Sequence, residues 1–395
     1  MKKYIFILIF SLLSSTAKAA LTFEVETTVR PEMQTSITDE DGDSIDRDAF
    51  EDPTGIAFSN NGLKAFVTNK KGDSDKGKCI SEITLTVPFD FTYSHTQTNR
   101  ADVLKNLVGK TGDNLKCYDI KFSNDGKKVF VSNVEDSIFA FDLPIPFNLS
   151  GISYVSGSET DFSARNFDFN EDGTKLFTLP EHVSSKTLKE YSLATAYDIT
   201  TSTLLTSTNL ASTLVETVND SSTNNDLPTS LEFSKDGSML FILVINNFDE
   251  AFLGADFLED EIFQFKLTTP FDTSTMSLVG SSNVTSGYPA ASGDYSLGFT
   301  ISPNGNRLFI INQSVGASDI GNDSISQVNL SCFFGIGACR TDIVSGIGSH
   351  VETAKRDIHF NNSTMFKRFE WIKRNRNSEN LNSFNINLKS YNPIL

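Results

Sequence analysis

The chain has 395 residues, of which 33 are Phe, and a net charge of −17 at pH 7. The charge is uneven: residues 20–339 contain 21 basic and 45 acidic side chains, a net charge of −24, whereas residues 340–395 carry +4. An acidic body repels nucleic acid and anionic membrane surfaces, so we expect no nucleic-acid partner.

Residues 1–19 have the pattern of a secretory signal peptide. Lys2 and Lys3 precede an apolar segment over residues 4–13, and Ala17-Lys18-Ala19 forms a cleavage site,. The apolar segment is too short for an ordinary membrane span, although an uncleaved anchor is the alternative. We therefore expect an exported protein, located in the periplasm, at the cell surface or outside the cell.

Residues 21–29 alternate apolar and polar side chains. Leu21, Phe23 and Val25 are separated by Thr22 and Glu24. This period of two predicts a β-strand at the start of the mature chain.

An acidic loop follows this strand. Its carboxylates are closely spaced around a single glycine, Gly42, and comprise Asp39, Asp41, Asp43, Asp46 and Asp48. Hard cations take several oxygen ligands from one flexible loop, so calcium is the candidate ion. The pattern resembles the Asp-rich calcium loops of thrombospondin type 3 repeats, but it lacks EF-hand spacing. A solvated acidic insertion without metal is the equal alternative.

A short motif recurs five times in the body of the chain. Each copy has alternating apolar residues, then Asn or Asp before Gly, then Phe four residues later. The copies are Gly55–Gly62 with Phe66, Asp119–Gly126 with Phe130, Asn166–Gly173 with Phe177, Ser230–Gly237 with Phe241, and Gly298–Gly305 with Phe309. Repeats at such spacing predict a repeat architecture.

Each copy predicts an antiparallel hairpin. The alternation before the glycine is that of a strand, and the residues after it form a returning strand that packs in the same core. We expect the Asn/Asp-Gly pair to supply the positive φ angles of a tight turn.

Further strands follow each hairpin. Third strands are expected at residues 80–85, 137–143, 188–193, 261–267 and 325–330, and turn cues such as Pro88-Phe89-Asp90 lead into fourth strands. Four antiparallel strands per repeat predict an all-β protein, a β-propeller of five blades near residues 50–100, 118–160, 164–207, 229–281 and 295–331. Residues 21–29 would complete the last blade and close the ring, which removes a sheet edge. A stacked open solenoid is the structural alternative.

The four cysteines allow two disulfides in an exported protein. Cys332 and Cys339 are close in sequence, which leaves Cys79 with Cys117 as the second pair. Three pairings are possible, so this one is a preference.

The repeat resembles bacterial YVTN-type β-propeller repeats of exported proteins. The shared pattern is Phe-Ser-x-Asp-Gly-x-x-x-Phe-Val, as at residues 122–131, followed by a Tyr/Phe-x-Leu strand and Pro-Phe-Asp. The resemblance covers residues 50–331 and implies the propeller fold. Fold alone does not imply a function.

Residues 340–395 form a basic tail with two short stretches of helical periodicity. Together with the cysteines, Ala354-Lys355-Arg356 and residues 366–375 resemble the linker between a propeller and an autotransporter-like outer-membrane barrel. The chain lacks the many alternating segments of such a barrel. The resemblance implies an outer-membrane association through the tail, or a truncated remnant of such a protein.

The sequence selects no catalytic residue and no organic cofactor. The four histidines do not group as metal ligands, and no Gly-x-Ser-x-Gly elbow, P-loop or dinucleotide motif occurs,. Carboxylates at the centre of the ring could act in catalysis, but 45 acidic residues are too many to choose among.

We therefore expect a monomeric exported propeller that binds an unknown ligand or protein partner, without enzymatic activity. The alternative is a propeller enzyme, a lactonase or glycoside hydrolase that acts at the central channel. A convergent trio of acids or His at the channel mouth would favour the enzyme, and a featureless or sealed channel would favour the binding module.

Overall fold

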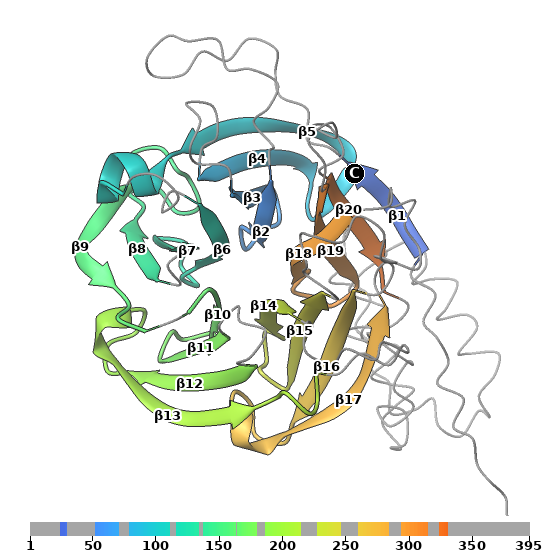
Figure 1. Cartoon of the computed structure of the whole chain (residues 1–395). Helices are drawn as coiled ribbons and strands as arrows, with labels where there is room; N and C mark the ends of the chain where they lie inside the picture. The colour runs from blue at the N-terminus through green and yellow to red at the C-terminus, as the bar shows by residue number, and fades with distance from the viewer. Residues whose placement is uncertain are drawn as a thin grey trace, which may run out of the picture. The chain divides into compact units, whose positions relative to one another are not determined.

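Five four-stranded antiparallel sheets around one axis form the computed structural model, a β-propeller (Figure 1). The structure describes residues 24–29 as backbone, and residues 52–70, 79–110, 116–133, 137–162, 164–179, 186–214, 227–245, 260–283, 294–314 and 324–330. The chain divides into two units, Met1–Cys339 and Arg340–Leu395, and all described residues belong to the first.

Each blade runs outward from the axis. Blade 1 has β2 (Pro53–Phe58), β3 (Lys64–Asn69), β4 (Ile80–Val87) and β5 (Asp90–Ala101); blade 2 has β6 (Cys117–Phe122), β7 (Lys128–Asn133), β8 (Ile138–Asp142) and β9 (Ser153–Glu159). Blade 3 has β10 (Asn166–Phe169), β11 (Lys175–Leu179), β12 (Thr187–Leu193) and β13 (Ser202–Asn209). Blade 4 has β14 (Leu227–Phe233), β15 (Met239–Ile245), β16 (Glu261–Leu267) and β17 (Met276–Asn283); blade 5 has β18 (Asp294–Ile301), β19 (Arg307–Ser314), β20 (Ser324–Asn329) and β1 (Glu24–Val29).

The ring of blades is closed, and strands from both ends of the described chain take part in the closure. The innermost strands β2, β6, β10, β14 and β18 contact one another in that order, and β18 contacts β2. The N-terminal strand β1 pairs antiparallel with β20 and completes blade 5 (Figure 1). A blade is thus shared between both ends of the described chain, in the place that the alternation over residues 21–29 predicts.

The hairpin turns correct one sequence-based expectation. Gly62, Gly126, Gly173, Gly237 and Gly305 have φ between 68° and 70°, but the preceding Asn or Asp residues do not have positive φ. In blade 2 the Gly126 N–H donates to Ser123 O, while the Asp125 carboxylate accepts from Ser123 Oγ and Lys127 N. The acidic residue is needed as an acceptor inside the turn, not for its backbone freedom.

An aromatic ring rests on each of the first four turn glycines. Phe89, Phe147, Tyr197 and Phe271 have φ between 52° and 59°, and a Cβ on the facing glycine would lie 2.2–2.3 Å from the ring. In blade 2 the Phe147 N–H also donates to Gly126 O. Glycine is therefore required twice, for its φ angle and for the space that the ring occupies.

The repeated phenylalanines pair between blades rather than within one hairpin. Phe66 of blade 1 packs on Phe122 of blade 2 with ring centroids 4.6 Å apart, and Phe309 of blade 5 packs on Phe58 of blade 1 at 4.6 Å. The equivalent pairs Phe130–Phe169 and Phe177–Phe233 have separations of 4.6 and 4.3 Å. The motif therefore encodes the interface between neighbouring blades.

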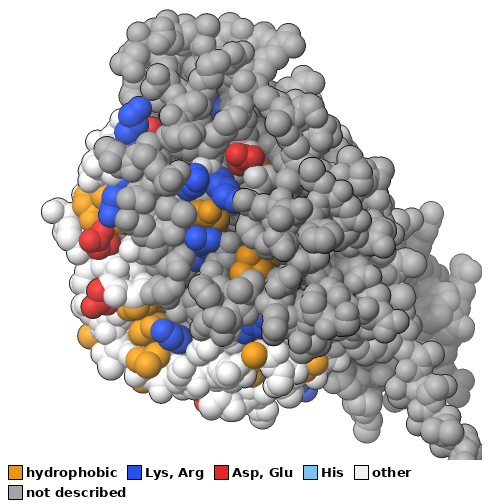
Figure 2. Space-filling model, in the orientation of Figure 1, with side chains coloured by type: hydrophobic (Ala, Val, Ile, Leu, Met, Phe, Trp, Pro, Cys, Tyr) orange, Lys and Arg blue, Asp and Glu red, His pale blue; other side chains and the backbone are white. Residues whose placement is uncertain are grey.

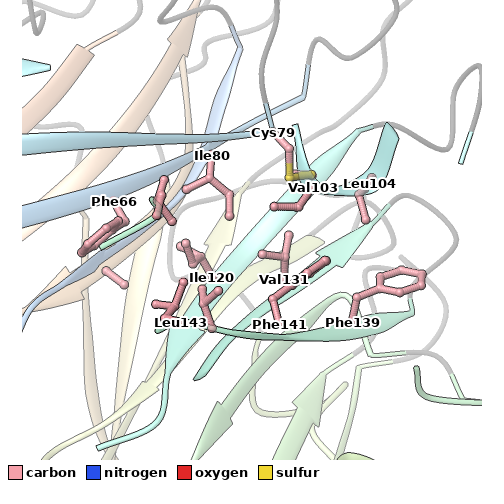
Figure 3. Close-up of a cluster of buried hydrophobic side chains, with 14 residues drawn as sticks. Phe66, Cys79, Ile80, Val103, Leu104, Ile120, Val131, Phe139, Phe141 and Leu143 are labelled. Carbon is pink, nitrogen blue, oxygen red and sulfur yellow. A yellow bond between two sulfur atoms is a disulfide. The ribbon is translucent and has the colours of Figure 1, made fainter. Parts of the chain in front are cut away.

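A disulfide links blades 1 and 2 beside the short π-helix η1 (Val103–Val108). Cys79 precedes β4 and Cys117 begins β6, with Cα atoms 5.5 Å apart. Figure 3 shows the disulfide among buried side chains that include Val103, Ile120 and Val131. This is the pairing that the sequence favours, while Cys332 and Cys339 lie outside the described residues.

Several sequence predictions fall outside the described residues. They are the signal peptide at 1–19, the acidic loop with Asp39, Asp41, Asp43, Asp46 and Asp48, and the tail at 340–395. Among the described residues, the other helices are the 3-10 turns η3 (Ile199–Thr201) and η4 (Thr273–Thr275). Within the described part of the chain, no helix is long and apolar enough to cross a membrane.

Candidate functional site

The inner strands alternate between the blade interfaces and the axis. Second positions of the five motifs are fully or almost fully buried between blades, as at Ile56, Ile120 and Phe167. Because side chains alternate along a strand, the first and third positions point toward the axis. The third positions are Ala57, Lys121, Asp168, Glu232 and Thr300, and the first positions are Gly55, Asp119, Asn166, Ser230 and Gly298.

Four of the side chains at these first and third positions are charged, and they meet near the axis. Lys121 from β6 lies 3.6 Å (Nζ to Oε2) from Glu232 of β14, although these strands belong to non-adjacent blades. Asp119 and Asp168 also act electrostatically on Lys121. Three acids thus converge on one ammonium group in the middle of the ring, and we call Asp119, Lys121, Asp168 and Glu232 the axial cluster.

Each acid of the axial cluster also accepts a backbone hydrogen bond from the next blade. Asp119 Oδ2 accepts from Phe167 N at 3.2 Å, Asp168 Oδ2 from Phe233 N at 2.8 Å, and Glu232 Oε1 from Ile301 N at 2.9 Å. The acids therefore join blades 2, 3, 4 and 5 in sequence. They are structural groups as well as candidates for chemistry.

The other two interfaces close by direct backbone approach. A Cβ on Gly55 would lie 2.6 Å from Tyr118 O, and a Cβ on Gly298 would lie 2.2 Å from Thr54 O. Thr54 Oγ1 donates to Cys117 O at 2.9 Å. Blades 5, 1 and 2 thus meet tightly at the level of the first motif positions.

Burial determines the ionisation of the axial cluster. It raises the pKa of Asp119 to about 6 and that of Glu232 to about 7, against the opposing effect of Lys121. Burial also raises the pKa of Asp168. Burial would lower the pKa of Lys121, but the three acids outweigh it and raise that pKa, so the ammonium stays protonated,.

A cavity of about 330 Å³ opens above the axial cluster on the side of the hairpin turns. Its floor includes Lys121, Asp168, Glu232 and the small side chains Ala57 and Thr300. Its wall is largely aromatic and includes Phe58, Phe89, Phe122, Phe147, Phe169, Tyr197, Phe233 and Phe271. At its rim Lys235 Nζ lies 3.6 Å from Glu171 Oε1.

One face of the ring presents side chains of both charges. Figure 2 shows Lys and Arg side chains, with fewer Asp and Glu, near the middle of one face of the ring. The acids of the axial cluster instead lie inside the ring, where Asp119 is 5% exposed. Net charge alone therefore does not describe what a ligand meets at the axis.

Sequence reasoning missed the axial cluster. The 45 acidic residues of the body are too many to choose among individually. Aligning the five motifs, however, singles out the few that carry a charge at the first or third position. Four charges at aligned axis-facing positions of a propeller are the signal that could have found the site. Among the described residues no group of three His, Cys, Asp or Glu has metal-binding geometry, and the predicted Asp39–Asp48 loop lies outside that part of the chain.

No known family model and no curated protein matches the sequence. Solved structures similar to this chain include a 6-phosphogluconolactonase candidate from Bacteroides fragilis, at 17% identity and TM-score 0.33, covering 65% of this chain and 64% of that one. Hydrazine synthase from Kuenenia stuttgartiensis is 14% identical with TM-score 0.35, covering 71% and 63%. Periplasmic gluconolactonase from Pseudomonas aeruginosa is 14% identical with TM-score 0.34, covering 73% and 72%.

The chain thus spans less than two thirds of the first two of these structures. Similarity at this level does not identify a ligand or an activity.

Proposed function

We propose that this chain is an exported propeller that binds a small molecule in its central cavity. The observation that carries the proposal is the position of the cavity, at the axis, with a charged floor and an aromatic wall. Its volume of about 330 Å³ lies at the lower end of the range for small-molecule sites. Apolar walls with a few convergent polar groups are typical of such sites.

Export is the second part of the proposal. The signal-peptide pattern at residues 1–19 and the resemblance to YVTN-type exported propellers support it. The periplasm, the cell surface and the extracellular medium all fit these two observations.

The test fills the cavity without altering its charges. The mature chain, residues 20–395, would be screened by thermal shift against sugars, lactones, amino acids and amines, and any ligand confirmed by calorimetry. Because Ala57 lies at the floor, Ala57→Leu should weaken the ligand at least about tenfold through steric exclusion, a loss of roughly 1.4 kcal/mol. Ala194→Leu, at an exposed turn, is the matched control and should bind normally.

Two results would contradict this site. One is a ligand that binds Ala57→Leu and the unmodified chain equally well. The other is a panel in which no compound raises the melting temperature of the unmodified chain.

The raised pKa of Glu232 favours a second candidate, a hydrolase for lactones or glycosides. A carboxyl group with a pKa of about 7 can donate or accept a proton at neutral pH, which suits a general acid or base. Asp168 beside it would provide the second carboxylate. This candidate ranks second because Asp119, Asp168 and Glu232 already bond to backbone N–H groups of the next blades.

A direct assay separates the two functions. If the chain hydrolyses a lactone or aryl glycoside, Glu232→Gln should reduce kcat about 100-fold or more, because proton transfer is lost. Glu159→Gln, on an exposed outer strand, should leave the rate unchanged. Absence of turnover across both substrate classes would remove the enzyme candidate and leave the binding proposal standing.

A further inference from the structure

The axial cluster contains more negative charge than it can balance internally. Asp119, Asp168 and Glu232 face a single ammonium, that of Lys121. No other first or third position of the five motifs is charged: these positions are Gly55 and Ala57 in β2, Asn166 in β10, Ser230 in β14, and Gly298 and Thr300 in β18. Full ionisation would leave two uncompensated negative charges among side chains that are mostly buried below the cavity.

The same three acids connect the blades. Each carboxylate accepts the N–H of a residue on the next inner strand, at Phe167, Phe233 and Ile301. Thr300 Oγ1 adds a second bond to Glu232 Oε1 at 3.2 Å. The charge state of the cluster and the hydrogen bonds between blades 2, 3, 4 and 5 therefore depend on the same carboxyl groups.

We propose that the axial cluster is a proton-operated clasp, which holds the inner strands of blades 2 to 5 most strongly when its carboxyl groups are partly protonated and weakens as the pH rises from mildly acidic values through neutrality. A protonated acid keeps a carbonyl oxygen that accepts the backbone N–H of the next blade, so protonation removes repulsion without removing the link. Ionisation of the last carboxyl adds an uncompensated charge at the axis. Lys121 remains the common counter-ion throughout.

Other charged groups near the cluster do not share its role. Lys235 and Glu171 pair with each other at the rim, and Glu171 is about half exposed. Burial raises the pKa of Tyr197, and the charge of Asp168 contributes to raising it. The Tyr197 hydroxyl, however, donates to Glu171 O and accepts from Asn124 N. The clasp is thus confined to residues of β6, β10 and β14.

The direction of the pH effect follows from linkage. A carboxyl whose pKa is raised on folding binds more protons in the folded state, so its favourable contribution is present at low pH and is lost as the pH rises through the folded pKa. For Glu232 the folded pKa is about 7 and the reference value 4.5. For Asp119 the corresponding values are about 6 and 3.8.

The acids with lowered pKa do not add to the change in stability over the pH range in which Glu232 and Asp119 titrate. Asp90, Asp125, Asp172, Asp236 and Asp272 all have pKa values below 3.8. Their contribution is lost only as the pH falls through the unfolded value and below. Between pH 5 and 8 the clasp should therefore dominate among these groups.

The experiment is urea unfolding of the mature chain at pH 5, 6, 7 and 8. We expect the folding equilibrium constant to fall on the order of 100-fold between pH 5 and 8 from Glu232 alone, with about a further tenfold from Asp119. Glu232→Gln keeps an oxygen that can accept from Ile301 N but cannot ionise. The larger part of the fall of the folding equilibrium constant with pH, which we call the slope, should therefore disappear in this variant. Glu159→Gln should keep the slope of the unmodified chain.

A second measurement does not depend on any variant folding. The backbone ¹⁵N shift of Ile301 should titrate near pH 7 in the unmodified chain, and that of Phe167 near pH 6. The proposal is overturned if stability is constant or rises between pH 5 and 8, if Glu232→Gln keeps the full slope, or if the Ile301 shift does not titrate. None of these measurements requires a ligand, so they stand apart from the proposed binding function.

Discussion

In the hairpin turns, single residues explain why the repeat requires glycine. Gly126 has φ +70°, and Phe147 covers the place where its Cβ would be. Phe147 itself has φ +52°, an unusual conformation for an aromatic residue,. One bond, from Phe147 N to Gly126 O, and one ring contact hold both in place. Gly126 and Phe147, which follows Pro146 in a later turn of the same blade, are therefore one structural unit.

Replacing Gly126 by Ala should destabilise the propeller more than the same change at Gly157. Both glycines lie in blade 2 with φ of 70° and 76°, but a Cβ at Gly157 would meet nothing within 4 Å. Gly157→Ala should cost about 1–2 kcal/mol for the left-handed backbone alone. Gly126→Ala adds displacement of the Phe147 ring. Urea unfolding of both variants measures the difference, and equal losses would show that the ring contact is unimportant.

Charged side chains at the start of the second strands β3, β11 and β19 link neighbouring blades, and we call these links latches. Lys175 of β11 pairs with Glu190 of β12 at 2.6 Å and donates to Phe271 O of blade 4 at 2.7 Å. Glu190 Oε2 accepts from Thr273 N and Oγ1, also in blade 4. Lys64 with Glu82 makes the same link from blade 1 to blade 2, and Arg307 with Asp90 links blade 5 to blade 1.

Loss of such a latch should cost more than loss of an ordinary surface pair. Lys175→Met leaves the carboxylate of Glu190, 3% exposed, without its cation, so we expect about 2–4 kcal/mol after allowing for the partial exposure of Lys175. Lys128→Met is the control, because Lys128 pairs with the exposed Asp142 of the same blade, and its cost should be below about 1 kcal/mol. Similar values for the two variants would refute an interblade role for Lys175.

At the scale of the whole ring, closure depends on β1. This strand pairs with β20 and supplies the outer strand of blade 5, whereas every other blade is built from four consecutive strands. Without β1, the edge of β20 is left unpaired. An open strand edge promotes association with other chains.

A chain that begins at residue 30 should therefore be less stable and more prone to self-association than one that begins at residue 20. Light scattering or size-exclusion chromatography would detect the association, and thermal unfolding the loss of stability. Adding a peptide of residues 20–29 should restore both properties, since its backbone can pair with β20. An equally stable, monomeric shortened chain would show that blade 5 does not need its fourth strand.

The sequence by itself determined the hairpins, their number and the strand that completes the fifth blade, because alternation and turn residues are local signals. Two properties were decided only by tertiary structure. Phe66 and Phe122 belong to different copies of the repeat, and their contact exists because blades stack around an axis. Asp119, Lys121, Asp168 and Glu232 lie on three separate strands, and a local pattern does not state which side of each strand faces the axis. Their raised carboxyl pKa values come from burial at the axis, a property of the closed ring rather than of any segment,.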